Sequence, residues 1–126
     1  NDLSGLSVYY GGGVGTKPED VFRASLEIDP NDHNARYYLA EILLARGKRD
    51  VRWDLPEAAE EELLEALSYV PMRLDILLSL ADAYFEWDDQ EKAAEFYTRY
   101  IQAGGAAPRA FERVKTAPTE SIGVNP

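Results

Sequence analysis

The sequence predicts an all-α protein built from repeated pairs of helices, and three observations support this prediction. The segment LEIDP at residues 26–30 recurs as LSYVP at residues 67–71, an offset of 41 residues. A second similar pair, AAEEELLEAL from Ala58 and KAAEFYTRYI from Lys92, is offset by 34 residues. Apolar residues in these regions recur at steps of three and four, the spacing of an amphipathic helix rather than the alternation of a strand. A fixed period of about 20 to 50 residues is typical of stacked helical repeats.

Start signals place the individual helices. TKPE at Thr16 and DLPE at Asp54 each offer a capping oxygen, a first-turn proline and a glutamate three residues after the cap. Asp32 or Asn31 offers a cap to the helix that begins near His33. We expect helices at residues 3–10, 18–29, 32–46, 56–70, 73–87, 89–103 and 107–115.

The two offsets differ by seven residues, and this difference predicts an inserted turn after Gly47, at residues 47–55. A length of 126 residues is that of one domain. The expected divisions are a partial, irregular repeat at 3–30, a repeat at 31–71 that contains the inserted turn, a repeat at 72–105, a C-terminal helix at 106–116 and a tail at 117–126.

These features resemble the tetratricopeptide repeat. The resemblance rests on the 34-residue spacing, a large-small-large pattern in each first helix, small residues in each second helix and a proline that closes each unit. The residues that carry it are Leu39, Ala40, Leu43, Leu80, Ala81, Tyr84, Ala59, Ala93, Pro30 and Pro71. The chain departs from the family at Arg36 and Leu77, where an aromatic residue is usual, and at Gly105, where a proline is expected.

The resemblance covers about residues 3–105 and implies a helical solenoid with about two full repeats, a partial N-terminal repeat and a C-terminal capping helix. It also implies a scaffold or adaptor that binds proteins and is not an enzyme. In this family the first helices of successive repeats line a concave groove. The groove residues implied for this chain are Asn34, Tyr37, Tyr38, Glu41, Leu44, Asp75, Leu78, Asp82, Phe85 and Glu86.

This acidic and aromatic set suits a partner protein or peptide with basic and apolar residues. Some members of the family bind the carboxylate end of chaperone tails with Lys, Asn and Arg, and the acids here disfavour that mode. The alternative interpretation is that Tyr37, Leu44 and Phe85 belong to the core between the helices.

The glycine-rich stretch GGGVGTK at Gly11 to Lys17 raises the question of phosphate binding. A P-loop requires lysine before the hydroxyl residue and a strand before the loop. Here Thr16 precedes Lys17, Pro18 lacks the N–H that would donate, and the preceding segment is predicted helical. The stretch also lacks the glycine spacing of a dinucleotide site. We therefore interpret it as a connection between helices and expect no cofactor.

Catalytic and metal sites find little support. His33 is the single histidine and we expect it to be an exposed first-turn residue. The segment from Asp29 lacks the glycine and glutamate of a calcium loop. The adjacent acids at 60–62 and 88–89 could suggest paired carboxylates, but acids in a row on an amphipathic helix usually face solvent.

The net charge of the chain limits the classes of partner that it can bind. The chain has 13 Lys and Arg against 23 Asp and Glu, a net charge of −10, which opposes binding to nucleic acid and to anionic membrane surfaces. No apolar run approaches the roughly 18 residues of a membrane span, so we expect no direct membrane contact from this segment. The absence of cysteine fits both reducing and oxidising compartments and leaves the localisation open.

Three alternatives to binding in the groove remain. Basic residues gather beside Trp53 in ARGKRDVRWDL; we expect Trp53 to pack locally and the charges to face solvent, and a contact with an acidic patch of a partner or a second copy is the alternative. An incomplete first repeat could also expose apolar helix surface and lead to a homo-oligomer. The long turn in the middle repeat resembles, faintly, that of bacterial envelope assembly factors that handle apocytochrome c.

Overall fold

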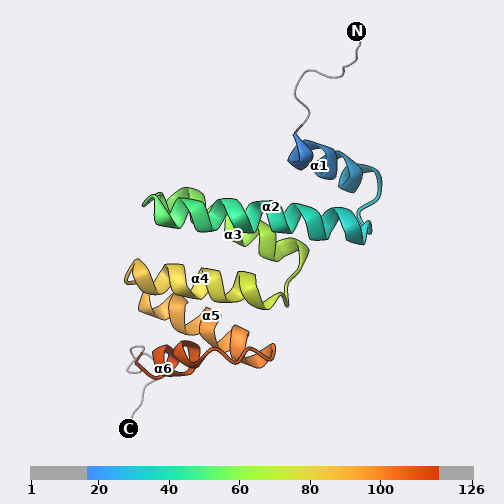
Figure 1. Cartoon of the computed structure of the whole chain (residues 1–126). Helices are drawn as coiled ribbons and strands as arrows, with labels where there is room; N and C mark the ends of the chain where they lie inside the picture. Colours follow the sequence, from blue (N-terminus) through green and yellow to red (C-terminus); the bar gives the residue numbers. More distant parts are fainter. Residues whose placement is uncertain (1–16, 117–126) are drawn as a thin grey trace. The chain divides into compact units, whose positions relative to one another are not determined.

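A computed structural model of the chain describes residues 17–116, and this range forms six helices and contains no strand (Figure 1). The helices are α1 (Pro18–Ile28), α2 (His33–Arg52), α3 (Pro56–Tyr69), α4 (Leu74–Glu86), α5 (Gln90–Gln102) and α6 (Pro108–Thr116). The all-α fold expected from the sequence is confirmed. The helix expected at 3–10 and the glycines at 11–15 lie outside the described residues.

Contacts divide the chain into two compact units, with the boundary between Ile42 and Leu43 inside α2. The first unit contains α1 and the first half of α2, and the second contains the rest of α2 and α3 to α6. That the chain acts as a single domain stays a prediction.

The largest difference from the expected helices concerns the end of α2. The sequence predicted a turn at residues 47–55, but α2 continues to Arg52 and only residues 53–55 turn before α3. Gly47 is therefore a helical residue rather than a turn residue. A Cβ at Gly47 would stand 2.5 Å from Cγ of Leu63, so the glycine lets α3 approach α2 closely. The predicted inserted turn is wrong in this respect, because the added residues lengthen a helix.

Helix starts agree with the sequence in their prolines but not in all their caps. Pro18 and Pro56 occupy the first turns of α1 and α3, as expected. The N-cap of α3 is Leu55, which has no side-chain oxygen, so the cap expected from Asp54 is not formed; Asp54 instead has a φ of 61° in the turn. Asp32 does cap α2, because its Oδ1 accepts a hydrogen bond from the Ala35 amide at 3.1 Å.

In the first unit, α1 and the start of α2 meet through aromatic and polar contacts. The rings of Phe22 and Tyr38 stack with centroids 5.4 Å apart. Nε of Arg36 donates to the carbonyl oxygen of Pro30 at 2.8 Å, which fixes the turn between the helices. Arg36 thus stabilises the turn at a position where the family usually has an aromatic residue.

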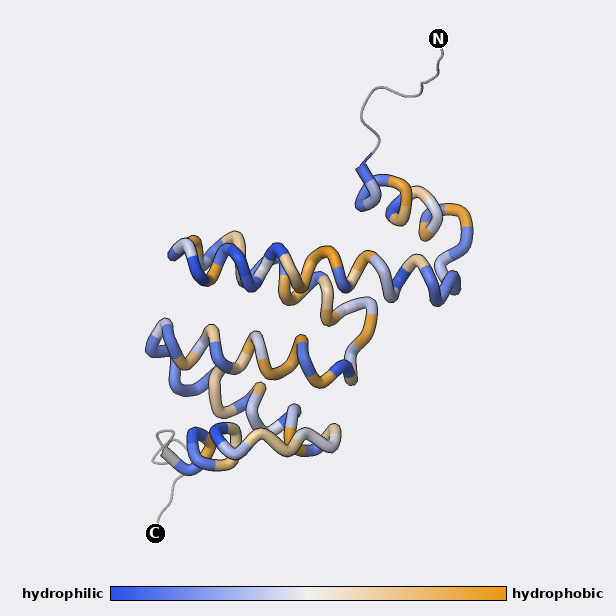
Figure 2. The backbone as a smooth tube through the Cα atoms, viewed as in Figure 1, coloured by the Kyte–Doolittle hydropathy of each residue, from blue (hydrophilic) through white to orange (hydrophobic). Residues whose placement is uncertain are grey.

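The core of the second unit lies where α4 packs against α3 and α5. Its largest fully buried side chains are Leu43, Leu63, Ile76, Leu77, Leu80 and Tyr97. Each buried leucine or isoleucine contributes about 1.5–3 kcal/mol relative to an exposed position. Ala59, Ala81 and Ala93 are buried as the repeat pattern predicts, and their small size permits close helix packing. Figure 2 shows the apolar residues interspersed with polar ones along these helices, as amphipathic packing requires.

Candidate functional site

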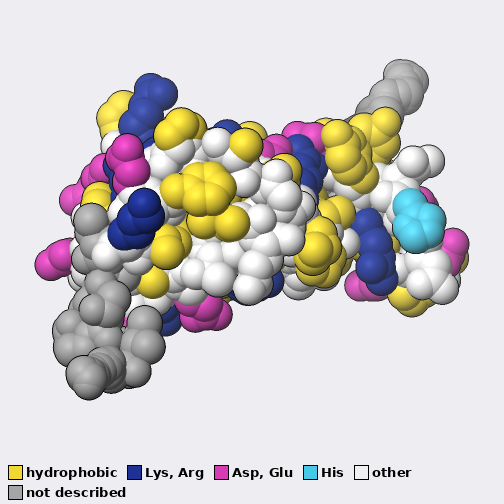
Figure 3. All heavy atoms as spheres, turned by 90° about the horizontal axis from the view of Figure 1, so that it is seen from below, with side chains coloured by type: hydrophobic (Ala, Val, Ile, Leu, Met, Phe, Trp, Pro, Cys, Tyr) yellow, Lys and Arg dark blue, Asp and Glu magenta, His cyan; other side chains and the backbone are white. Residues whose placement is uncertain are grey.

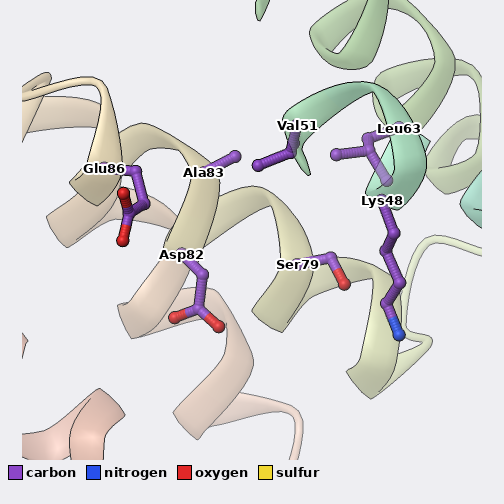
Figure 4. A pocket seen from close by; sticks show the side chains of 7 residues that line it. All are labelled: Lys48, Val51, Leu63, Ser79, Asp82, Ala83 and Glu86. Atoms are coloured by element: carbon purple, nitrogen blue, oxygen red, sulfur yellow. The ribbon is translucent and has the colours of Figure 1, made fainter. Parts of the chain in front are cut away.

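A surface pocket of about 200 Å³ lies in the second unit, where the last turns of α2 face α3 and α4 (Figure 4). Seven residues line it: Lys48, Val51, Leu63, Ser79, Asp82, Ala83 and Glu86. Because α4 carries four of these residues at steps of three and four, one face of this helix forms most of the wall.

The pocket has an apolar floor and a polar rim. Figure 4 shows Val51, Leu63 and Ala83 directed toward one another. Lys48 and Glu86 are exposed, and neither has an ion pair or hydrogen bond with another described side chain. A floor of this kind excludes water from an apolar group, while the two rim charges can orient a polar one.

Asp82, on the rim, is the centre of a hydrogen-bond network that joins α4 to α5 and α6. Arg109 donates from Nη2 to Oδ2 at 2.7 Å, and its Nε lies 3.1 Å from both carboxylate oxygens. Arg113 donates from Nη1 to Oδ1 at 3.1 Å and to the hydroxyl oxygen of Tyr97 at 2.8 Å. The Tyr97 hydroxyl itself donates to Oδ1 of Asp82. Two guanidinium groups therefore neutralise this carboxylate.

The same network reaches the aromatic residue that follows on α4. The guanidinium of Arg113 lies 4.1 Å from the ring centroid of Phe85, a cation–π contact. The ring of Tyr97 meets Phe85 edge to face with centroids 6.4 Å apart. Burial, together with the hydrogen bond to Asp82, raises the pKa of Tyr97 to about 12, although Arg113 acts in the opposite direction. The tyrosine thus remains a neutral donor at all physiological pH values.

A second acidic site lies between α2 and α3. The side chains of Asp50 and Glu62 interact by a hydrogen bond, and both are largely buried. Burial, the hydrogen bond and the charge of Asp50 raise the pKa of Glu62 to about 7. Oε1 of Glu62 is buried and has no hydrogen-bond partner among the described residues.

Sequence reasoning missed this pair because it treated the acids at 60–62 as one solvated face. Glu61 is exposed, as expected, but Glu62 points inward. The available signal was the helical step: Glu62 stands three positions after the core residue Ala59 and four before the core residue Ala66.

The implied groove residues fall in both units. In the first unit, Asn34, Tyr37 and Tyr38 are exposed and Glu41 is half-buried. In the second unit, Asp82 and Glu86 line the pocket, while Leu78 and Phe85 are half-buried on the same helix.

Two of the implied groove residues have other roles in the second unit. Leu44 is only 5% exposed and belongs to the core, as the alternative interpretation held. Asp75 is held in a two-bond fork by Arg73, with distances of 2.7 and 2.9 Å. That the groove residues bind a partner stays a prediction.

Other candidate sites gain no support from residues 17–116. His33 is the exposed first residue of α2, as expected. Within this range no three His, Asp or Glu side chains are grouped as metal ligands, and no helix has the length and apolar character needed to cross a membrane.

Comparison with known proteins bears on the repeat. Residues 21–50 match the tetratricopeptide repeat family, a range that begins in α1, crosses the turn at Pro30 and ends in α2. No curated protein matches the chain. Members of this family are typically non-enzymatic modules that bind other proteins. The match supports, over residues 21–50, the tetratricopeptide resemblance seen in the sequence, and the described residues have the all-α fold that this resemblance implies.

Proposed function

We propose that this protein is a scaffold that captures a segment of a partner protein at the pocket between α2 and α4. The observation that carries the proposal is the combination of an apolar floor with rim charges that have no ion pair within the described residues. The tetratricopeptide match supports protein binding in general, and the pocket supports a particular place for it.

The size of the pocket supports an apolar side chain as its occupant. A protein cavity of about 150 Å³ accepts a benzene ring, and this pocket is about 200 Å³. A leucine, methionine or phenylalanine of the partner would contact Val51, Leu63 and Ala83 there. Such an apolar anchor in a desolvated pocket usually supplies most of the affinity.

Fewer acidic residues of the pocket rim are available to attract a basic ligand than the sequence alone suggested. Asp82 is neutralised by Arg109 and Arg113, so it adds little attraction for a basic ligand. Glu86 keeps its charge available at the edge of the pocket. We therefore expect a partner segment with an apolar anchor and a Lys or Arg placed to reach Glu86.

A displayed library of random peptides, selected against the full chain, tests this function. We expect enriched sequences that contain an apolar residue close to a basic one. Their affinity should fall about tenfold, or about 1.4 kcal/mol, for Glu86→Lys, because charge repulsion replaces attraction. Val51→Trp should reduce affinity at least as much, because the larger ring fills the pocket.

Glu95→Lys is the matched control, since Glu95 is an exposed acid of α5 that lies outside the pocket. It makes the same change in net charge and should leave affinity within about twofold of the parent. Equal losses for Glu86→Lys and Glu95→Lys would mean that only overall charge matters and would rule out the pocket.

Self-assembly is the other function considered from the sequence, and it can be distinguished from binding of a different protein with the same variants. Sedimentation velocity across a concentration series should show a constant mass if the pocket serves a different protein. A mass that rises with concentration and returns to the monomer value in Val51→Trp would identify a second copy as the partner.

A further inference from the structure

Polar contacts hold α6 to the rest of the second unit. Its arginines at positions 109 and 113, one helical turn apart, both reach Asp82. Arg113 also lies over Phe85 and donates to Tyr97. Three side chains from α5 and α6 thus surround one carboxylate of α4, and Phe85 of α4 packs against two of them.

Apolar burial contributes much less to this attachment than to that of the other helices. Ala110 is the one fully buried side chain among the described side chains of α6, whereas α4 buries six residues and α5 buries four. Phe111 is 42% exposed. The arginine side chains at 109 and 113 retain 46% and 30% exposure, so water and salt screen their ion pairs.

The local backbone also permits α6 to leave. A nine-residue helix is marginal without tertiary contacts, so α6 depends on its docking. Gly104, in the connection before it, has a φ of 107°, which glycine adopts without strain. The amides of Ala106 and Ala107 donate to the Tyr100 hydroxyl at 3.2 and 3.0 Å and fix the connection ahead of the helix.

We propose that α6 is an internal ligand of the face formed by Asp82, Phe85 and Tyr97, and that a partner helix with two arginines four residues apart replaces it. This inference rests on the proposed scaffold function and names a second element that the partner presents. The face adjoins the pocket, since Asp82 belongs to both.

The chemistry of the partner follows from what α6 presents. Two guanidiniums are needed at positions i and i+4, the first to form the fork with Asp82 and the second to cover Phe85. A small residue must follow the first arginine, because Ala110 is fully buried there. The expected motif is therefore Arg, small, any, any, Arg on a helix. Lysine at either place would lose the fork and the stacking.

Figure 3 supports a mixed polar contact rather than an apolar one on the side of the molecule that it draws. Hydrophobic, basic and acidic side chains lie side by side there, without one continuous apolar surface. Glu86, one helical turn after Asp82, adds a negative charge at this edge of α4. A basic helix is the partner that this charge distribution attracts.

A synthetic peptide with the sequence of residues 106–116, AAPRAFERVKT, is the probe, and fluorescence anisotropy measures its binding to the full chain. In the parent, tethered α6 competes at an effective concentration on the order of millimolar. The variant Arg109→Gln/Arg113→Gln weakens that competitor and leaves the face intact. We expect the peptide to bind this variant about tenfold more tightly than the parent.

Two controls define the result. Adding Asp82→Asn to the double variant should abolish the gain, and a peptide with both arginines replaced by glutamine should not bind. Equal affinity for the parent and the double variant, or binding that survives Asp82→Asn, overturns the proposal. Circular dichroism verifies folding, and if the double variant is unfolded, the single Arg109→Gln variant must show a smaller gain or the proposal also fails.

Failure here is distinguishable from failure of the scaffold function. If library peptides still require Glu86 and Val51 while the α6 peptide never binds, the pocket function stands and only the exchange of α6 is wrong.

Discussion

Two acidic sites in the second unit show how position decides what a carboxylate does. Asp82 and Glu62 both lie between helices, and their side chains are 29% and 17% exposed. Asp82 accepts hydrogen bonds from two arginines and a tyrosine. The guanidinium of Arg46 stands 3.9 Å from Glu62, and another carboxylate, Asp50, interacts with Glu62 and raises its pKa.

The two carboxylates differ both in burial, which is greater for Glu62 and is the main cause of its raised pKa, and in charge compensation. Asp82 can remain charged because donors surround it, so its network links three helices by ionic hydrogen bonds. Glu62 lacks enough donors and retains a proton to near neutral pH. The first site therefore joins α6 to the unit, and the second makes the α2–α3 contact sensitive to pH.

The largest expected effect comes from removing the compensated carboxylate. Asp82→Ala leaves Arg109, Arg113 and Tyr97 without their common acceptor, and we expect a loss of about 2–3 kcal/mol in the free energy of unfolding. Urea denaturation followed by circular dichroism measures it.

Asp75→Ala is the matched control for Asp82→Ala. Asp75 also forms a fork with an arginine, but its side chain is 44% exposed and its partner Arg73 lies two residues away on the same segment. This substitution should cost about 0–1 kcal/mol. Similar losses for both variants would mean that the network between helices adds nothing beyond a local ion pair.

The second effect tests the uncompensated site through pH. The pKa of Glu62 is about 7 in the folded chain, against an ordinary value of 4.5, so folding takes up a proton between these pH values. Its stabilising contribution is complete below about pH 4.5 and is lost as pH rises through 7. Glu62→Gln carries no charge to bury. We expect the difference in unfolding free energy between variant and parent to shift toward the variant by about 1–2 kcal/mol from pH 4.5 to 8.

Glu61→Gln is the control for this pH series, since Glu61 is the exposed neighbour on the same helix. Its difference from the parent should stay constant with pH. A constant difference for Glu62→Gln as well would contradict the raised pKa of Glu62.

The fold was predicted well from the sequence because residues at matching positions of a repeat occupy equivalent places in the helix packing. Alanines at matching positions of the two offsets lie in the core, and prolines begin α1 and α3. The end of α2 could not be predicted in the same way. Glycine favours turns in general, which is why a turn was expected at Gly47. In the structure, glycine is needed there because Leu63 of α3 packs against it, and this contact cannot be predicted from the residues near Gly47 in the sequence.

The candidate site was less accessible to sequence reasoning. Asp82 and Glu86, two of the groove residues that the resemblance implied, both line the pocket from α4, and their binding to a partner stays a prediction. The arginines that neutralise Asp82 stand 27 and 31 positions later in the chain, on α6. The periodicity of apolar residues does not predict where α6 packs. A charge counted from sequence as attractive to a partner is thus already occupied within the chain.

The smallest expected effect tests whether the two arginines satisfy the hydrogen-bonding capacity of Asp82 without the Tyr97 hydroxyl. Tyr97→Phe removes a hydroxyl that donates to Asp82 and accepts from Arg113, while the ring keeps its place in the core. We expect a loss of about 1 kcal/mol in urea denaturation, because Arg113 can still reach Asp82 directly. Tyr84→Phe is the comparison, since its hydroxyl only donates to Glu60, at 2.7 Å, and Lys92 also neutralises that carboxylate. Its loss should be smaller, about 0.5 kcal/mol. A larger loss for Tyr84→Phe than for Tyr97→Phe would show that the arginines alone satisfy Asp82, and that the network around α6 is purely ionic.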